Sequence, residues 1–125
     1  MRAVRVLLID DSPLQLRVRE VILRDAGLEV CIATTAESAH ALLRSEGVGE
    51  SIGVIVTDHV LPGASGADFV RQLREIRPSV PVIVITGLPE AEDEYKGLSV
   101  VFRQKPVPPP ELIALVRESI KNESA

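Results

Sequence analysis

The chain is short of several residue types on which particular functions depend. It has one cysteine, no tryptophan and only 2% aromatic residues among 125 positions. A lone Cys31 excludes an internal disulfide and a cysteine-based metal cluster. The scarcity of aromatic rings disfavours a surface that stacks nucleic-acid bases, and the formal net charge of −4 disfavours a basic binding face. We therefore expect no direct binding of nucleic acid.

Long hydrophobic runs are also missing. No apolar stretch reaches the roughly 20 residues that a membrane-spanning helix needs, and residues 1–4 lead directly into a strand-like run instead of a signal peptide. The chain is 46% hydrophobic and 26% charged, which is typical of a globular protein. We expect one cytoplasmic domain over residues 1–125, with no membrane segment and a buried core.

What the sequence does contain is a regular alternation of strand-like and helical segments. Strands are predicted near 4–9, 28–33, 53–57, 81–86 and 98–103, and helices near 13–26, 35–46, 66–77, 89–96 and 109–121. Such alternation is typical of βαβ units around a parallel sheet. We predict an α/β fold, namely a doubly wound, flavodoxin-like (βα)5 domain with strand order 2-1-3-4-5. The segment 28–33 alternates in polarity, as an edge strand would.

Polar and small residues mark the helix ends. Ser12 is predicted to cap the first helix, with the Gln15 side chain reaching back to it, and Gly27 to end it. Two later pairs offer the same capping box, namely Thr34 with Glu37 and Ser65 with Asp68. The prolines at 108–110 are predicted to begin the last helix, because proline fits a first helical turn. We assign them no function.

Polar residues follow four of the apolar runs, at the point where each predicted strand ends. These residues are Asp10 and Asp11 after 6–9, Asp58 after 54–57, Thr86 after 82–85, and Lys105 shortly after 100–102. The carboxyl ends of parallel strands lie side by side, and ligands bind in the crevice outside them. Three carboxylates, a hydroxyl and an ammonium group are therefore expected to converge.

This set of residues suits the handling of a phosphoryl group. Asp10, Asp11 and Asp58 offer hard oxygen donors for Mg²⁺, and adjacent carboxylates need a cation to relieve their repulsion. The less specific interpretation is a solvated acidic loop. A carboxylate such as Asp58 can attack phosphorus, provided that cations neutralise the phosphoryl oxygens. Lys105 supplies such a cation.

Two further groups complete the predicted site. Thr86 supplies a hydroxyl, and Gly87 leaves room for a backbone N–H to approach a phosphoryl oxygen. Two histidines are assigned no chemistry. His59 is expected at the rim or surface, because strand alternation points it away from Asp58, and His40 is expected to pack or to lie at the surface.

The chain resembles the receiver domain of bacterial two-component response regulators along nearly its whole length, and most of all the single receivers similar to chemotaxis regulators. The matching segments are Asp10-Asp11, Asp58-x-x-Leu61-Pro62-x-x-x-Gly66, Ile85-Thr86-Gly87 and Lys105-Pro106. The resemblance implies that Asp58 accepts a phosphoryl group from a histidine kinase or phosphotransfer protein. It implies a phosphorelay signalling protein, not an enzyme, that assists its own phosphorylation and dephosphorylation.

The resemblance also implies roles for other residues. Together with the three aspartates, the Val60 carbonyl would organise Mg²⁺, directly or through water. Thr86 and Phe102 would form the switch, with Thr86 drawn toward the phosphoryl group and Phe102 rotating inward behind it. The Lys105-Pro106 peptide bond would be cis.

The sequence departs from the receiver pattern between Thr86 and Lys105, where it is a few residues short. The fourth helix is therefore expected to be short or irregular. Its acidic start at 89–94 offers little apolar surface for the usual dimer face, so a monomer is favoured. No output domain follows the last helix, so output is expected through a partner protein, unless the chain is a piece of a longer regulator or hybrid kinase.

Three other functions are alternatives to the receiver. A metal-dependent phosphohydrolase with an aspartyl nucleophile usually carries an Asp-x-Asp arrangement and a lid, and here the acids are adjacent and the loops short. In a flavodoxin-like flavin carrier, Asp10 and Asp11 would repel the flavin phosphate. A pseudo-receiver that binds partners without phosphorylation is disfavoured by the intact set of acids, threonine and lysine.

Overall fold

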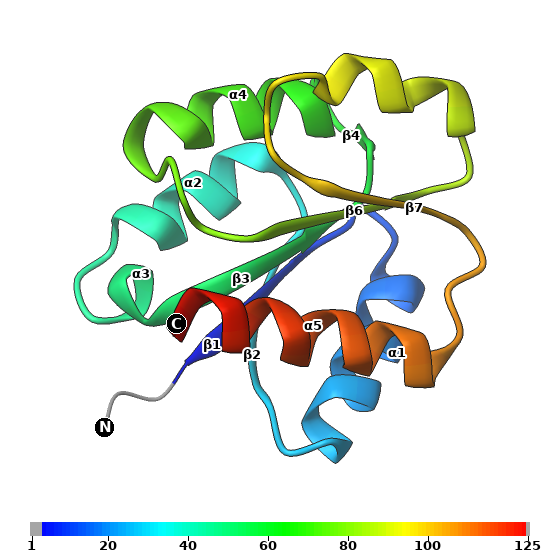
Figure 1. The fold of residues 1–125 in the computed structure, drawn as a ribbon. Coiled ribbons are helices and arrows are strands. Elements are labelled where there is room, and N and C mark those ends of the chain that lie inside the picture. The colour runs from blue at the N-terminus through cyan, green and yellow to red at the C-terminus, as the bar shows by residue number, and fades with distance from the viewer. Residues whose placement is uncertain (1–3, 125) are drawn as a thin grey trace.

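A five-stranded parallel sheet forms the centre of the molecule (Figure 1). The structure is a computed structural model and describes residues 4–124. The strands are β1 (Arg5–Ile9), β2 (Glu29–Ala33), β3 (Ile52–Thr57), β6 (Val82–Thr86) and β7 (Val101–Gln104). They lie in the order β2-β1-β3-β6-β7. Counted along the chain, this is the predicted order 2-1-3-4-5, so the doubly wound, flavodoxin-like fold is confirmed.

Helices cover both faces of the sheet. They are α1 (Pro13–Asp25), α2 (Ala36–Arg44), the single turn α3 (Val48–Ser51), α4 (Gly66–Ile76), the 3₁₀ helix η1 (Pro89–Tyr95) and α5 (Pro109–Ser124). In Figure 1, α1 and α5 lie on one side of the sheet and α2 and α4 on the other. Within residues 4–124, none of the helices combines the length and apolarity that a bilayer crossing demands.

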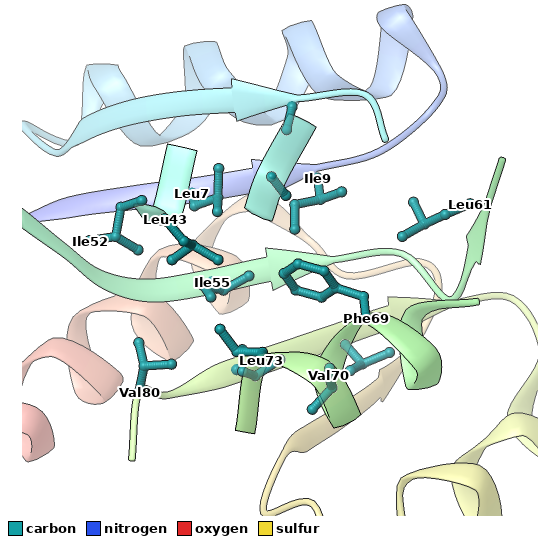
Figure 2. Packing of buried hydrophobic residues seen from close by; sticks show 14 of the residues in the cluster. Leu7, Ile9, Leu43, Ile52, Ile55, Leu61, Phe69, Val70, Leu73 and Val80 are labelled. Atoms are coloured by element: carbon teal, nitrogen blue, oxygen red, sulfur yellow. The ribbon is translucent and has the colours of Figure 1, made fainter. Parts of the chain in front are cut away.

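The core consists of two apolar layers that share the strands. Successive side chains of a strand point to opposite faces of a sheet, so β1 sends Leu7 and Ile9 into one layer and Val6 and Leu8 into the other. Figure 2 shows the first layer, in which the α4 residues Phe69 and Leu73 pack near Leu7, Ile9 and Ile55. The second layer receives α1 and α5. Burial on both faces explains why the central strands are almost continuously apolar.

The ends of α1 follow the prediction in part. The Ser12 hydroxyl accepts a hydrogen bond from the Gln15 backbone N–H at 3.3 Å, and Gly27 follows the helix with a φ of +86°. Glycine suits that position because residues with a side chain rarely adopt positive φ. The Gln15 side chain, however, does not reach back to Ser12. Its Oε1 accepts from Lys105 Nζ at 2.9 Å.

The cap of α2 lies one residue later than predicted. Thr35 and not Thr34 has the extended backbone of a capping residue, and its Oγ1 accepts from the Ser38 N–H at 3.0 Å. Ser38 therefore takes the place expected for Glu37. The predicted box at α4 is confirmed, because Ser65 Oγ accepts from the Asp68 N–H at 3.1 Å and the Ser65 N–H donates to the Asp68 carboxylate at 3.2 Å.

Three local features differ from the predicted elements. The short α3 and a hairpin of β4 (Val60–Leu61) and β5 (Ala64–Ser65) were not predicted, since each is too short to show a periodic pattern. The last strand is shorter than predicted, because Gly97 and Ser99 before it adopt positive φ. Two expectations are confirmed: the fourth helix is irregular, a 3₁₀ helix, and Pro109 begins α5.

Candidate functional site

Asp58 lies at the carboxyl end of β3, directly beside the end of β1. Its backbone N–H donates to the Ile9 carbonyl at 3.1 Å. Carboxylate oxygen Oδ1 accepts from the backbone N–H groups of His59 at 2.6 Å and Val60 at 3.3 Å, and Oδ2 accepts from Lys105 Nζ at 2.8 Å. The Asp58 side chain is only 10% exposed. A buried carboxylate with charge-assisted donors on both oxygens is held in one orientation.

Lys105 reaches Asp58 from the loop after β7. Its backbone N–H donates to the Thr86 carbonyl at 2.8 Å, which ties this loop to the end of β6. The Lys105-Pro106 peptide bond is cis, as predicted. The ammonium group also donates to Gln15 of α1, so it connects β3, β7 and the first helix. The predicted pairing of this lysine with the acidic site is therefore present in the structure.

Asp10 is also buried, but its carboxylate already has partners. Oδ1 accepts from the Ser12 backbone N–H at 2.9 Å, and Oδ2 pairs with Arg19 Nη1 at 3.1 Å. Sequence reasoning missed Arg19. Its spacing from Gln15 could have indicated this role, because residues four apart share one face of a helix. The first turn of α1 also lies directly after Asp10 and Asp11. That face of α1 supplies both Arg19 and Gln15 to the site.

Asp11 differs from the other two acids. Its side chain is exposed and forms no ion pair within the described residues. Among residues 4–124, no three His, Cys, Asp or Glu side chains come together as ready metal ligands. The donor chemistry nevertheless suits Mg²⁺, which takes one or two carboxylates and keeps several waters. Asp11, Asp58 and the Val60 carbonyl fit that requirement, while Arg19 holds Asp10.

The remaining predicted residues lie at the end of β6 and on β7. Thr86 is buried at the end of β6, and its Oγ1 accepts from the Leu88 N–H at 3.3 Å. A Cβ on Gly87 would meet no atom within 4 Å, so the structure gives no steric reason for glycine there. Phe102 on β7 is half-buried, and its ring centroid lies 5.8 Å from that of Tyr95.

Comparison with known proteins decides the family. The family model for the response regulator receiver domain matches residues 6–117. The chain belongs to this family. The transcriptional regulatory protein AruR of Pseudomonas aeruginosa is 32% identical over 121 residues, which are 94% of this chain and 49% of AruR. The C4-dicarboxylate transport transcriptional regulatory protein DctD of the same organism is 35% identical over 94% of this chain and 25% of its own length.

Solved receiver structures have the same fold. A CheY-like receiver domain protein from Methanospirillum hungatei superposes with a TM-score of 0.88 at 26% identity, covering 98% of this chain and 97% of that one. A receiver protein from Pseudomonas putida gives 0.85 at 28% identity, covering 94% and 98%. The receiver described here spans about half or less of the length of the curated relatives named above.

His59, the residue directly after Asp58, is buried, and the expectation of a rim or surface histidine is wrong. Its Nδ1 lies 2.7 Å from the Tyr95 hydroxyl oxygen, and its Nε2 lies 3.3 Å from the Glu94 carboxylate. Strand alternation failed here because the β4–β5 hairpin turns the chain directly after Asp58, and η1 then covers His59. His40, as expected, packs in the core, beside the Phe69 ring.

Tyr95 is a second residue that sequence reasoning missed. Burial raises the pKa of its phenol, and the nearby carboxylates of Glu94 and Asp58 raise it further, so the hydroxyl keeps its proton. Its ring lies between those of His59 and Phe102, at centroid distances of 5.5 and 5.8 Å. Tyr95 thus joins the loop after β3 to the predicted switch residue on β7. The sequence did not indicate this role, because a single tyrosine in an acidic segment forms no periodic pattern of buried residues.

We predict that Tyr95→Phe destabilises the receiver by about 1–2 kcal/mol, because it removes the hydroxyl partner of a buried imidazole nitrogen. Urea unfolding measures this cost. In a His59→Phe background the same change should cost less than about 0.5 kcal/mol, since the lost pair is already absent. An equal cost in both backgrounds would show that the hydrogen bond between the two side chains contributes nothing.

Proposed function

We propose that this receiver accepts a phosphoryl group on Asp58 from a histidine kinase or phosphotransfer protein, and that the modification switches its conformation to regulate a partner or output domain. The observation that supports the proposal most is the buried Asp58 carboxylate with the Lys105 ammonium at 2.8 Å, at the strand ends of a member of the receiver family.

The proposed reaction uses the carboxylate as a nucleophile. One Asp58 oxygen attacks the phosphorus atom, an O–P bond forms, and the bond from phosphorus to the donor breaks, so that the donor leaves with its electron pair. Before the reaction, the Lys105 ammonium group balances the negative charge of the Asp58 carboxylate. After the transfer, it pairs with a phosphoryl oxygen. The Thr86 hydroxyl donates to another phosphoryl oxygen, and the Gly87 N–H is proposed as a further donor. Each of these groups lies at the carboxyl edge of the sheet.

Mg²⁺ is the proposed cofactor of this reaction. Asp11, Asp58 and the Val60 carbonyl would hold it, with Asp10 contributing through water. When bound, the ion supplies positive charge that neutralises the phosphoryl oxygens. The exposure of Asp11 and its lack of an ion pair within the described chain support its role as a direct ligand.

The proposed switch consists of Thr86 and Phe102. In the present conformation the Thr86 hydroxyl accepts from Leu88, so turning it toward a phosphoryl group would release the loop that begins η1. Phe102 borders a hollow of about 290 Å³ between η1 and β7, whose other walls include Tyr95 and Val100. A half-buried ring beside open space can occupy two positions, and phosphorylation would bias the choice between them.

The signalling context forms the rest of the proposal. Two curated relatives are named as transcriptional regulators and are longer than this chain. A receiver can therefore act on an attached output domain or on a separate protein, and in either case we place it in the cytoplasm, without membrane or direct nucleic-acid contact of its own. The 3₁₀ form of η1 supports a monomer, because this segment belongs to the usual dimer face.

The stoichiometry of phosphate release from small donors tests the proposed function. With acetyl phosphate and Mg²⁺, intact mass spectrometry should show one added phosphoryl group per chain, with no multiple turnover of a phosphate monoester. A phosphohydrolase with the same nucleophile would instead turn over the monoester repeatedly. A chain that gains no mass at any donor concentration would point to a pseudo-receiver.

A further inference from the structure

We infer that Arg19 is a resident counter-charge in the acidic site, and that it lowers the Mg²⁺ affinity of this receiver below the value that its carboxylates alone would give. The inference rests on the proposed Mg²⁺ site. It concerns a side chain that lies outside the motif residues and reaches the site from the middle of α1.

The Arg19–Asp10 pair differs from an ordinary surface ion pair. The Asp10 side chain is 1% exposed and that of Arg19 is 13% exposed, with 3.1 Å between Oδ2 and Nη1. Exposed pairs contribute little, whereas a buried charge requires a partner. Arg17 on the same helix provides the contrast, since its side chain is 72% exposed and pairs only with Glu20 in the described chain.

The packing of Arg19 keeps its guanidinium group at the site. The side chain helps to line an apolar groove between α1 and α5, together with Ile22, Ile85 and Leu112. Long basic side chains bury their aliphatic stems against such surfaces while the charged end reaches a polar partner. The guanidinium group therefore stays near Asp10, and turning it out to solvent would leave a buried carboxylate unpaired.

The effect on Mg²⁺ follows from the local charge. With Lys105 on Asp58 and Arg19 on Asp10, two of the three carboxylates are already balanced by a cation. A divalent ion is attracted in proportion to the uncompensated negative charge near it. Arg19 also occupies an oxygen of Asp10 that could otherwise contact a metal-bound water. Removing the arginine charge should therefore tighten Mg²⁺ binding, on the order of fivefold in a partly solvated site.

Mg²⁺ titration of the intact chain, followed by amide NMR shifts at constant ionic strength, tests the inference. Arg19→Met should lower the dissociation constant about fivefold. Arg17→Met removes the same charge from the exposed side of α1 and should change the constant less than twofold, because solvent and salt screen it. Arg19→Lys keeps the charge and should stay within twofold of the parent. Arg19→Gln is a second charge-removing variant, should the methionine variant fail to fold.

An Asp11→Ala variant distinguishes a failure of the proposed Mg²⁺ site from a failure of the proposed role of Arg19. If it binds Mg²⁺ as tightly as the parent, the proposed metal site is wrong. If it loses binding while Arg19→Met matches the parent, the site stands and the role of Arg19 is overturned. An equal gain in Arg17→Met and Arg19→Met would also overturn it, since the effect would then come from overall charge.

Discussion

An Asp58→Asn variant should keep the fold and lose phosphorylation completely. Asparagine has nearly the shape of aspartate, and its amide oxygen can still accept the backbone hydrogen bonds of His59 and Val60. Its neutral amide, however, is not a nucleophile toward phosphorus. After incubation with acetyl phosphate and Mg²⁺, intact mass spectrometry should show the parent with one added phosphoryl group and the variant with none.

Control measurements make the Asp58 result specific. Asp25→Asn removes an exposed carboxylate at the end of α1, away from the site, and should be phosphorylated like the parent. Thermal unfolding should show that Asp58→Asn remains folded, although Lys105 loses a charged partner. Addition of a phosphoryl group to another residue of the variant, as fast as in the parent, would refute the assignment of Asp58.

A Gly66→Ala variant should lose about 3 kcal/mol of stability, at the upper end of the cost of inserting one methyl group into a packed region. A Cβ at this position would lie 2.7 Å from the Asp58 carbonyl oxygen, 3.0 Å from the His59 Cα and 2.5 Å from the Tyr95 hydroxyl. Two of these three atoms belong to the backbone, so no side-chain rotation relieves the contact. The start of α4 can approach the Asp58 loop only without a side chain.

Gly87→Ala is the matched control for stability. A Cβ there would meet no atom within 4 Å, so this variant should stay within about 0.5 kcal/mol of the parent. Urea unfolding of the three proteins gives both differences. Equal stability of the two variants would mean that the Asp58 loop moves away from α4 without cost, and that glycine at position 66 has another explanation.

The fold could be predicted from the sequence because its signals are periodic and repeated. Each central strand is an apolar run followed by a polar residue, and topology then places Asp58 and Lys105 together from distant positions. The position of the cap at Thr35 could not be predicted, because Thr34 and Thr35 are chemically alike and only the backbone path selects one. Local spacing also could not show that Gln15 turns toward Lys105 instead of Ser12.

The contributions of Arg19, His59 and Tyr95 depend on tertiary structure. Arg19 is one of several charged residues on α1, and only the packing of that helix on the sheet directs it to Asp10. His59 is buried because a hairpin too short to leave a pattern turns the chain after β3. Tyr95 belongs to a 3₁₀ segment, where helical periodicity does not apply. Motifs therefore gave the candidate site residues, but not the side chains that surround them.

The two apolar layers have one further consequence, for cooperativity. β1 and β3 contribute alternate side chains to both layers. The two layers are therefore built on the same strands, and neither layer can form without them. Loss of packing beneath α4 would loosen the same strands that support α1 and α5. Unfolding should therefore be all-or-none. We also expect a change at the Asp58 end of β3 to affect the packing of helices on both sides of the sheet.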